Sequence, residues 1–126
     1  MKKVYAAIFL LAIIVSAGVT ERIIANRTAE DILAAVSRTE KACEHNDQGE
    51  LYELSVDTKR RWEAHKPSLE LFFPHADIDC ADVSTEKLVI YAKDLDYIHL
   101  KATLAELKCA MTALKESENI TIYNLM

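Results

Sequence analysis

The chain opens on a long apolar run, and this run limits its fold more than any other feature. The sequence is apolar from Val4 to Val19, with no polar residue before Ser16, and charged residues at 21 and 22 end the run. About 17 residues rising about 1.5 Å each give about 25 Å of helix, against a hydrocarbon layer about 30 Å thick. The segment therefore lies between a membrane span and a secretory signal in length.

Two interpretations of this segment stay open. In both the chain is exported, because Lys2 and Lys3 hold the N-terminus in the cytoplasm by the positive-inside rule. In the first, residues 1–24 form a transmembrane anchor; in the second, they are a signal peptide, and cleavage releases a soluble protein that starts near Gly18. We prefer the anchor, because the apolar run is longer than the usual signal core of about 7 to 15 residues. A buried helix of a soluble domain is disfavoured, because the run has no polar face.

The rest of the chain is acidic. The first 20 residues hold two Lys and no acidic residue, so the remainder has 13 Lys and Arg against 20 Asp and Glu, a formal charge of −7. This balance argues against a nucleic-acid partner, whose phosphates attract a basic surface, and against tight electrostatic adhesion to an anionic membrane. Residues 25–126 suffice for one modest domain, which we expect outside the cytoplasm.

Few residues in this chain favour turns. It has only two Gly and two Pro in 126 residues, so we predict an all-α fold without the many turns that short strands need. After Ile24, apolar residues recur at steps of three and four, which predicts that the membrane helix continues unbroken into an amphipathic helix. Residues 46–49 tolerate a left-handed backbone and predict its end. The apolar positions are Ala25, Ala29, Ile32, Leu33, Val36 and Cys43.

Three further apolar stripes predict the remaining helices of a small antiparallel hairpin or bundle of about three to four helices. Pro67 suits a first helical turn, and Pro74 should break the chain. We expect the last two helices to form an antiparallel hairpin and residues 119–126 to form an extended or loosely helical tail that packs back on the bundle. The stripes are Leu51, Leu54, Thr58, Trp62 and His65; Ile78, Ala81, Thr85, Leu88, Ala92 and Leu95, with Val83 and Ile90 on a second stripe; and Leu100, Leu104, Leu107, Met111 and Leu114.

A family resemblance covers about half of the chain, from Trp62 to the C-terminus. From there the sequence resembles the family known as domain of unknown function 4363, whose members are short, mostly helical bacterial proteins with one N-terminal membrane helix. The resemblance implies a retained anchor and a helical fold, but no catalytic residue, because the family has no established activity. It is carried by Trp62, His75-Ala76-Asp77-Ile78-Asp79, Leu104-Ala105-Glu106-Leu107-Lys108 and Ile120-Thr121-Ile122-Tyr123-Asn124-Leu125.

The densest group of possible metal ligands lies between His75 and Asp82. Imidazole nitrogen and carboxylate oxygen hold divalent ions when they converge, and His75 shares a helix face with Asp79 or Asp82. Asp77, however, points to another side. We prefer the interpretation that the aspartates complement the positive end of a helix dipole. We therefore expect no metal and no cofactor, and keep His75, Asp79 and Asp82 as weak candidates.

Aromatic residues and cysteines are the other possible sites. Aromatic side chains dominate small cores, so we interpret the aromatic group as core, with a ligand pocket as the alternative. The cysteines are odd in number and lack a Cys-x-x-Cys spacing, which argues against a zinc or redox motif. We prefer three free thiols, with one disulfide as the alternative. The residues are Trp62, His65, Phe72 and Phe73 in the aromatic group and Cys43, Cys80 and Cys109 among the thiols.

No catalytic motif stands out. The sequence has no Gly-x-Ser-x-Gly, no glycine-rich phosphate loop and no His-Glu-x-x-His, so we do not expect an enzyme. We expect a single-pass membrane protein with a cytoplasmic N-terminus. Its helical domain would act at the outer face of the cytoplasmic membrane as a non-catalytic interaction or accessory component with an unknown protein partner. The alternatives are a metal- or small-ligand-binding sensor domain and a secreted helical protein after signal cleavage.

Overall fold

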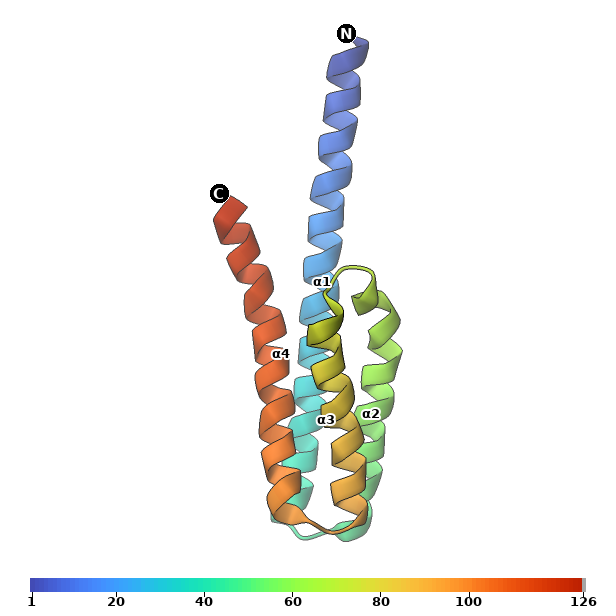
Figure 1. The fold of residues 1–126 in the computed structure, drawn as a ribbon, viewed down its shortest axis with the longest axis vertical. Coiled ribbons are helices and arrows are strands. Elements are labelled where there is room, and N and C mark those ends of the chain that lie inside the picture. Colours follow the sequence, from blue (N-terminus) through green and yellow to red (C-terminus); the bar gives the residue numbers. More distant parts are fainter. Residues whose placement is uncertain (126) are drawn as a thin grey trace.

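The computed structural model consists of four antiparallel helices, and the first helix extends far beyond the other three (Figure 1). The structure describes the backbone of residues 1–125 and the side chains of residues 1–116. Over this part of the chain it contains no strand, and the predicted all-α fold is confirmed. The helices are α1 (Lys2–Glu44), α2 (Gln48–Glu70), α3 (His75–Lys93) and α4 (Tyr97–Leu125).

The four helices form a closed ring in which each helix packs on its two neighbours. The packed pairs are α1 with α2, α2 with α3, α3 with α4, and α4 with α1. This is the up-down-up-down arrangement of a four-helix bundle with short connections. The predicted antiparallel hairpin of the last two helices is confirmed.

The first helix forms both the projecting segment and one helix of the bundle, as its unbroken apolar pattern predicts. Its residues up to Val19 are exposed, whereas burial begins at Ala25 and continues to Cys43. The helix ends at Glu44, and Asn46 adopts a left-handed backbone with φ 56°. Asn is one of the few residues that take this conformation readily, so the predicted helix stop is confirmed.

The two prolines behave differently. Pro74 precedes α3 as its N-cap residue, with φ −61° and ψ 143°, which confirms the predicted break. The placement of Pro67 in a first helical turn is wrong, because this residue lies in the last turns of α2. It deprives only the Glu63 carbonyl of a helical donor. Both residues are exposed, so the site is open to water, while the buried side chain of Leu69 holds the final turn against the bundle.

Leu95 does not continue the apolar stripe of α3, and that prediction is wrong. The amide of Asp96 donates to the Tyr91 carbonyl at 3.0 Å and the amide of Leu95 donates to the Ala92 carbonyl at 3.3 Å, the pattern of a Schellman motif. This motif requires a left-handed residue after the C-cap, and Leu95 takes it with φ 57° and remains 42% exposed. The amide of His99 then donates to Asp96, which caps the start of α4.

The core lies along the inner faces of all four helices. The predicted stripes of α3 and α4 are buried from Ile78 to Ala92 and from Leu100 to Met111, and the second stripe of α3, Val83 and Ile90, faces outward. Residues 119–125 continue α4 as a regular helix rather than an extended tail, and their expected packing concerns side chains outside the described residues. The largest fully buried side chains include Ile32, Leu51, Trp62, Leu69, Leu88, Leu100, Leu104, Leu107 and Met111.

Candidate functional site

The three weak metal candidates take different positions at the start of α3. His75 is the first residue of this helix and is exposed, and Asp79 is also exposed. Asp82 instead faces α2, where its Oδ1 accepts a hydrogen bond from Trp62 Nε1 at 2.6 Å and its Oδ2 lies 2.6 Å from Lys66 Nζ. Among the described residues, no group of three or more His, Cys, Asp or Glu is placed to hold a metal ion.

The contacts of Asp82 join α2 to α3 around the only tryptophan of the chain. Trp62 is 1% exposed, so its indole N–H needs a partner inside the protein, and the Asp82 carboxylate supplies it. The hydrogen bond with Asp82 also raises the pKa of Lys66. One helical turn of α3 further on, Lys59 lies 2.9 Å from Glu86, and this hydrogen bond raises the Lys59 pKa. Both charged pairs therefore hold α2 against α3.

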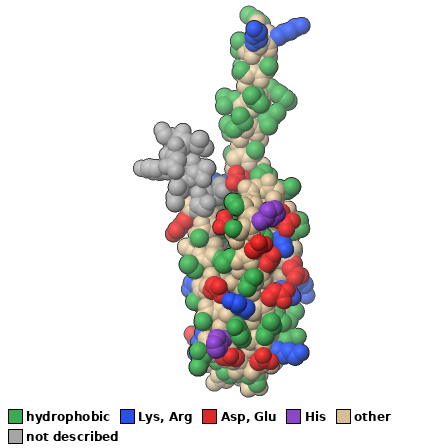
Figure 2. Space-filling model, viewed as in Figure 1, with side chains coloured by type: hydrophobic (Ala, Val, Ile, Leu, Met, Phe, Trp, Pro, Cys, Tyr) green, Lys and Arg blue, Asp and Glu red, His purple; other side chains and the backbone are tan. Residues whose placement is uncertain are grey.

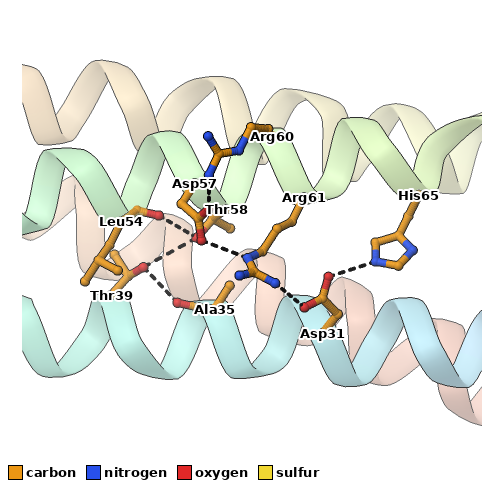
Figure 3. Close-up of polar contacts among 9 residues, drawn as sticks. All are labelled: Asp31, Ala35, Thr39, Leu54, Asp57, Thr58, Arg60, Arg61 and His65. Carbon is orange, nitrogen blue, oxygen red and sulfur yellow. Dashed lines mark hydrogen bonds and ion pairs between the residues drawn. The ribbon is translucent and has the colours of Figure 1, made fainter.

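A second polar network joins α1 to α2 (Figure 3). Asp31 projects from α1, and its two oxygens lie 2.8 Å from Arg61 Nη1 and 2.8 Å from His65 Nε2. Arg61 Nε also donates to Asp57 at 2.8 Å within α2, and Arg60 pairs with the other oxygen of Asp57. One guanidinium thus bridges two carboxylates, a geometry that its fork of donors suits.

The network shifts the pKa values of its carboxyl groups downward. Burial raises the pKa of Asp31, but the hydrogen bonds from His65 and Arg61 outweigh this effect, and the net pKa lies below the ordinary value of 3.8. The hydrogen bond from Arg61 is the main cause of the lowered pKa of Asp57. These groups are partly open to water, with side chains 29% and 21% exposed. Asp31, Asp57, Arg61 and His65 thus form a polar clamp between α1 and α2.

Sequence reasoning missed most of this network. It placed His65 in an aromatic group, and that placement is wrong, because the imidazole reaches Asp31 on α1. The spacing of Asp57 and Arg61, four residues apart, was a local signal that an ion pair forms on one helix face. No comparable signal connects Asp31 with Arg61, because these residues are 30 positions apart in the chain.

The aromatic residues near the α2–α3 turn mostly belong to the core, as predicted. Trp62 and Phe73 are buried, and Phe72 packs against the core from a partly buried position. Trp62 and Phe73 also border a cavity of about 360 Å³ between α2, α3 and α4. Its lining among the described residues is apolar apart from Asp77 and Cys80, so it offers volume for a small apolar molecule and little means to orient one. The lining residues are Trp62, Leu69, Phe73, Asp77, Ile78, Cys80, Ala110, Met111, Ala113 and Leu114.

The three cysteines are free thiols in different environments. Cys43 is buried in the bundle, whereas Cys80 and Cys109 are exposed on α3 and α4. Exposed thiols react with added reagents far more readily than buried ones. Cys80 and Cys109 are therefore accessible to thiol reagents in the folded protein.

These features define a four-helix bundle carried on an apolar N-terminal helix. The family model described as domain of unknown function (DUF4363) matches residues 20–125, so the chain belongs to that family. The matched range includes α2, α3, α4 and the bundled part of α1, and it begins directly after the apolar run. The resemblance recognised from Trp62 onward thus extends through α2 and the bundled part of α1. No curated protein and no solved structure shows a significant match.

Proposed function

We propose that this protein is a single-pass membrane protein whose helical bundle acts at the outer face of the cytoplasmic membrane through protein contacts rather than catalysis. The observation that carries the proposal is the projecting part of α1. This helix is long and apolar enough to cross a membrane, and none of its apolar window is buried. Figure 2 shows hydrophobic side chains along this projection and basic side chains at its tip. Lys2 and Lys3 there favour a cytoplasmic N-terminus.

The projection lacks a polar face, which favours lipid as its surroundings. Four consecutive residues cover all directions around a helix, and each of residues 8–11 is more than half exposed: Ile8 58%, Phe9 70%, Leu10 59% and Leu11 61%. A helix that packs on one soluble partner would need only one apolar face. The hydroxyl of Thr20 donates to the Ser16 carbonyl at 2.8 Å, so this polar group is satisfied within its own helix.

The outer face of α3 supports a role in protein contacts. Glu86 turns toward Lys59 on α2, and Lys87 lies 3.8 Å from Glu106 on α4. Between these two pairs the outward ridge of α3 carries Val83 and Ile90, which are 52% and 54% exposed. Apolar side chains at a seven-residue spacing on one helix face suit contact with a helix of another protein.

Thiol labelling tests the proposed orientation with the protein's own residues. A membrane-impermeant maleimide added to intact bacterial cells should label Cys80 and Cys109 without permeabilisation. The C80S/C109S variant is the matched control, since its remaining Cys43 is 4% exposed and should react only after unfolding. A K2C variant of that control should label only after permeabilisation. Labelling of Cys80 only in permeabilised cells would contradict the orientation.

N-terminal sequencing of the mature protein distinguishes the anchor from the secreted alternative. A start at Met1 in the membrane fraction supports the anchor, whereas a start near Gly18 in the soluble fraction supports signal cleavage.

Photo-crosslinking tests the proposed protein contacts. A photoreactive residue at Val83 or Ile90 should form a discrete adduct in cells, and the same residue at the exposed position Lys101 on α4 should not. Equal yields at all three positions would argue against a contact through α3.

The cavity beside Trp62 favours a second candidate function, a domain that binds a small apolar ligand. Its volume of about 360 Å³ falls within the range of small-molecule sites. An A110W variant should fill part of this volume, because Ala110 lines the cavity from a partly buried position. Aromatic compounds of the size of indole should raise the melting temperature of the wild type and leave that of A110W unchanged. The absence of any shift in the wild type would remove this candidate.

A further inference from the structure

The turn between α2 and α3 presents an apolar side chain at the end of the bundle from which α1 projects. We propose that this turn, Leu71 to Pro74, rests on the same lipid surface that α1 crosses, with Leu71 inserted among the headgroups. The inference rests on the proposed anchoring of α1. It gives the bundle a second membrane contact, which would fix its orientation relative to the bilayer.

Leu71 is held outward by the residues on either side of it. It is 78% exposed, one of the most exposed large apolar side chains of the described bundle, whereas Leu69 and Phe73 are 1% and 8% exposed. The amides of Phe72 and Phe73 both donate to the Leu69 carbonyl, at 3.1 and 2.9 Å. The buried side chains and these hydrogen bonds fix the turn, so the exposure of Leu71 is built into the fold.

The contacts between α1 and α2 set the height of this turn. Asp31 lies 2.8 Å from both Arg61 Nη1 and His65 Nε2, so it lies level with the turn of α2 between these two residues. Leu71 follows this turn by six to ten residues, and residues 21–25 of the antiparallel helix precede Asp31 by the same number. These steps measure about 9 to 15 Å along a helix, so Leu71 lies level with residues 21–25 of α1. Figure 1 shows the turn at the end of the bundle from which α1 projects.

This height coincides with the headgroup layer. Residues 21–25 lie two to six residues, or about 3 to 9 Å, beyond Val19, where the apolar run ends. An apolar run of about 25 Å centred in about 30 Å of hydrocarbon leaves about 2 to 3 Å of hydrocarbon beyond Val19. Headgroups add about 5 to 8 Å more on that side, so lipid reaches about 10 Å beyond Val19. Ile23 on α1, 46% exposed, adds a second apolar side chain to this layer.

The charges around the turn favour apolar insertion over electrostatic attraction. Lys66, the nearest lysine on α2, is paired with Asp82, and Glu70, Asp77 and Asp79 are exposed. These carboxylates are repelled by anionic headgroups. Vesicles of phosphatidylcholine, which carry no net charge, should therefore suffice for the contact.

Fluorescence in such vesicles tests the proposal on the full chain. The background is C80S/C109S, whose remaining Cys43 is 4% exposed and should not react in the folded protein. A cysteine is introduced at Leu71, Val83 or Leu10, one position per variant, and labelled with an environment-sensitive nitrobenzoxadiazole probe. Val83 is the matched control, because it is also apolar and 52% exposed but lies about 13 Å further from the membrane along α3. Leu10, in the middle of the apolar run, reports on the anchor itself. Lipids with spin labels at shallow and deep positions serve as quenchers.

The proposal predicts three distinct results. The probe at position 71 should emit at a shorter wavelength than the probe at 83 and lose most of its intensity to the shallow quencher. The probe at 83 should be quenched by neither lipid, and the probe at 10 should be quenched mainly by the deep one. If position 71 behaves like position 83 while position 10 is quenched, the membrane contact of the turn is refuted and the anchor stands. If position 10 also escapes quenching, the anchor is refuted and the turn contact with it.

Discussion

Replacement of Trp62 by Phe would remove the hydrogen bond to Asp82 while keeping an aromatic ring in the core. The bond joins a buried indole to a carboxylate at 2.6 Å, and hydrogen bonds to charged groups contribute about 1.5 to 3 kcal/mol. Two facts lower this figure: the Asp82 side chain is 27% exposed, and it keeps its contact with Lys66. We therefore expect W62F to lower the free energy of unfolding by about 2 kcal/mol, including the lost ring volume.

A double-mutant cycle isolates the hydrogen bond from the volume change. W62F, D82A and W62F/D82A are compared with the wild type, and the coupling energy between positions 62 and 82 should be about 1 to 2 kcal/mol. W62A should cost more, about 3 to 5 kcal/mol, because it leaves a cavity beside one that already exists. Y52F is the surface control: Tyr52 is 42% exposed, and the change should stay within about 0.5 kcal/mol.

Thermal unfolding of the full chain in detergent, followed by far-ultraviolet circular dichroism, measures these differences. For a bundle of about 100 residues, 1 kcal/mol corresponds to a shift of about 5 °C in melting temperature. W62F should therefore melt about 10 °C below the wild type. A coupling energy near zero would refute the reasoning, since it would show that the indole and the carboxylate do not stabilise each other. Equal effects of W62F and W62A would show that the ring volume contributes nothing.

Three further predictions concern other parts of the bundle. The lowered pKa values of Asp31 and Asp57 contribute stability that is present above the unfolded value of 3.8 and is lost as the pH falls through the folded pKa values. The melting temperature should therefore decrease when the pH is lowered below about 4, and this decrease should be less steep in D31N. L104A should lower the free energy of unfolding by about 2 to 5 kcal/mol, because Leu104 is 1% exposed. I98A should change it by less than about 0.5 kcal/mol, because Ile98 is 81% exposed. Similar changes for the two variants in denaturant titrations would contradict the assigned core. L95G should raise the melting temperature, because the left-handed backbone costs a leucine about 1 kcal/mol and a glycine almost nothing. N46G should change it little, because Asn tolerates this conformation. A lower melting temperature in L95G would mean that the contacts of the Leu95 side chain stabilise the protein by more than the strained backbone destabilises it.

Local patterns predicted the helices well and their ends less well. The stripe from Leu100 to Met111 was found because burial on one helix face repeats every three to four residues. The same rule failed at Leu95, because α3 ends in a Schellman motif two residues earlier. Leu95 therefore no longer lies on the helix face that carries the buried stripe. It failed at Pro67 because the packing of Leu69 outweighs one lost backbone hydrogen bond at an exposed site.

The candidate surfaces could be predicted only in part for a related reason. Val83 and Ile90 were recognised as a second stripe of α3, but periodicity does not say which of two stripes faces the core. Packing on both neighbours decided it: Glu86 pairs toward α2 and Lys87 toward α4, so the residues between them point away from the bundle. The pairing of His65 with Asp31 likewise depended on how α2 lies against α1.

The sequence by itself determined the apolar run from Val4 to Val19, the all-α fold and the continuous helix that joins this run to the bundle. These properties depend on residues close together in the chain, whose periodicity and turn preferences act locally. Only the tertiary structure decided that Asp31 bridges to α2, that Asp82 accepts the hydrogen bond of the Trp62 indole, and that Leu71 lies level with residues 21–25 of α1. The register between helices follows from the packing of whole faces and from the geometry of the turns, which residues distant in the chain determine together.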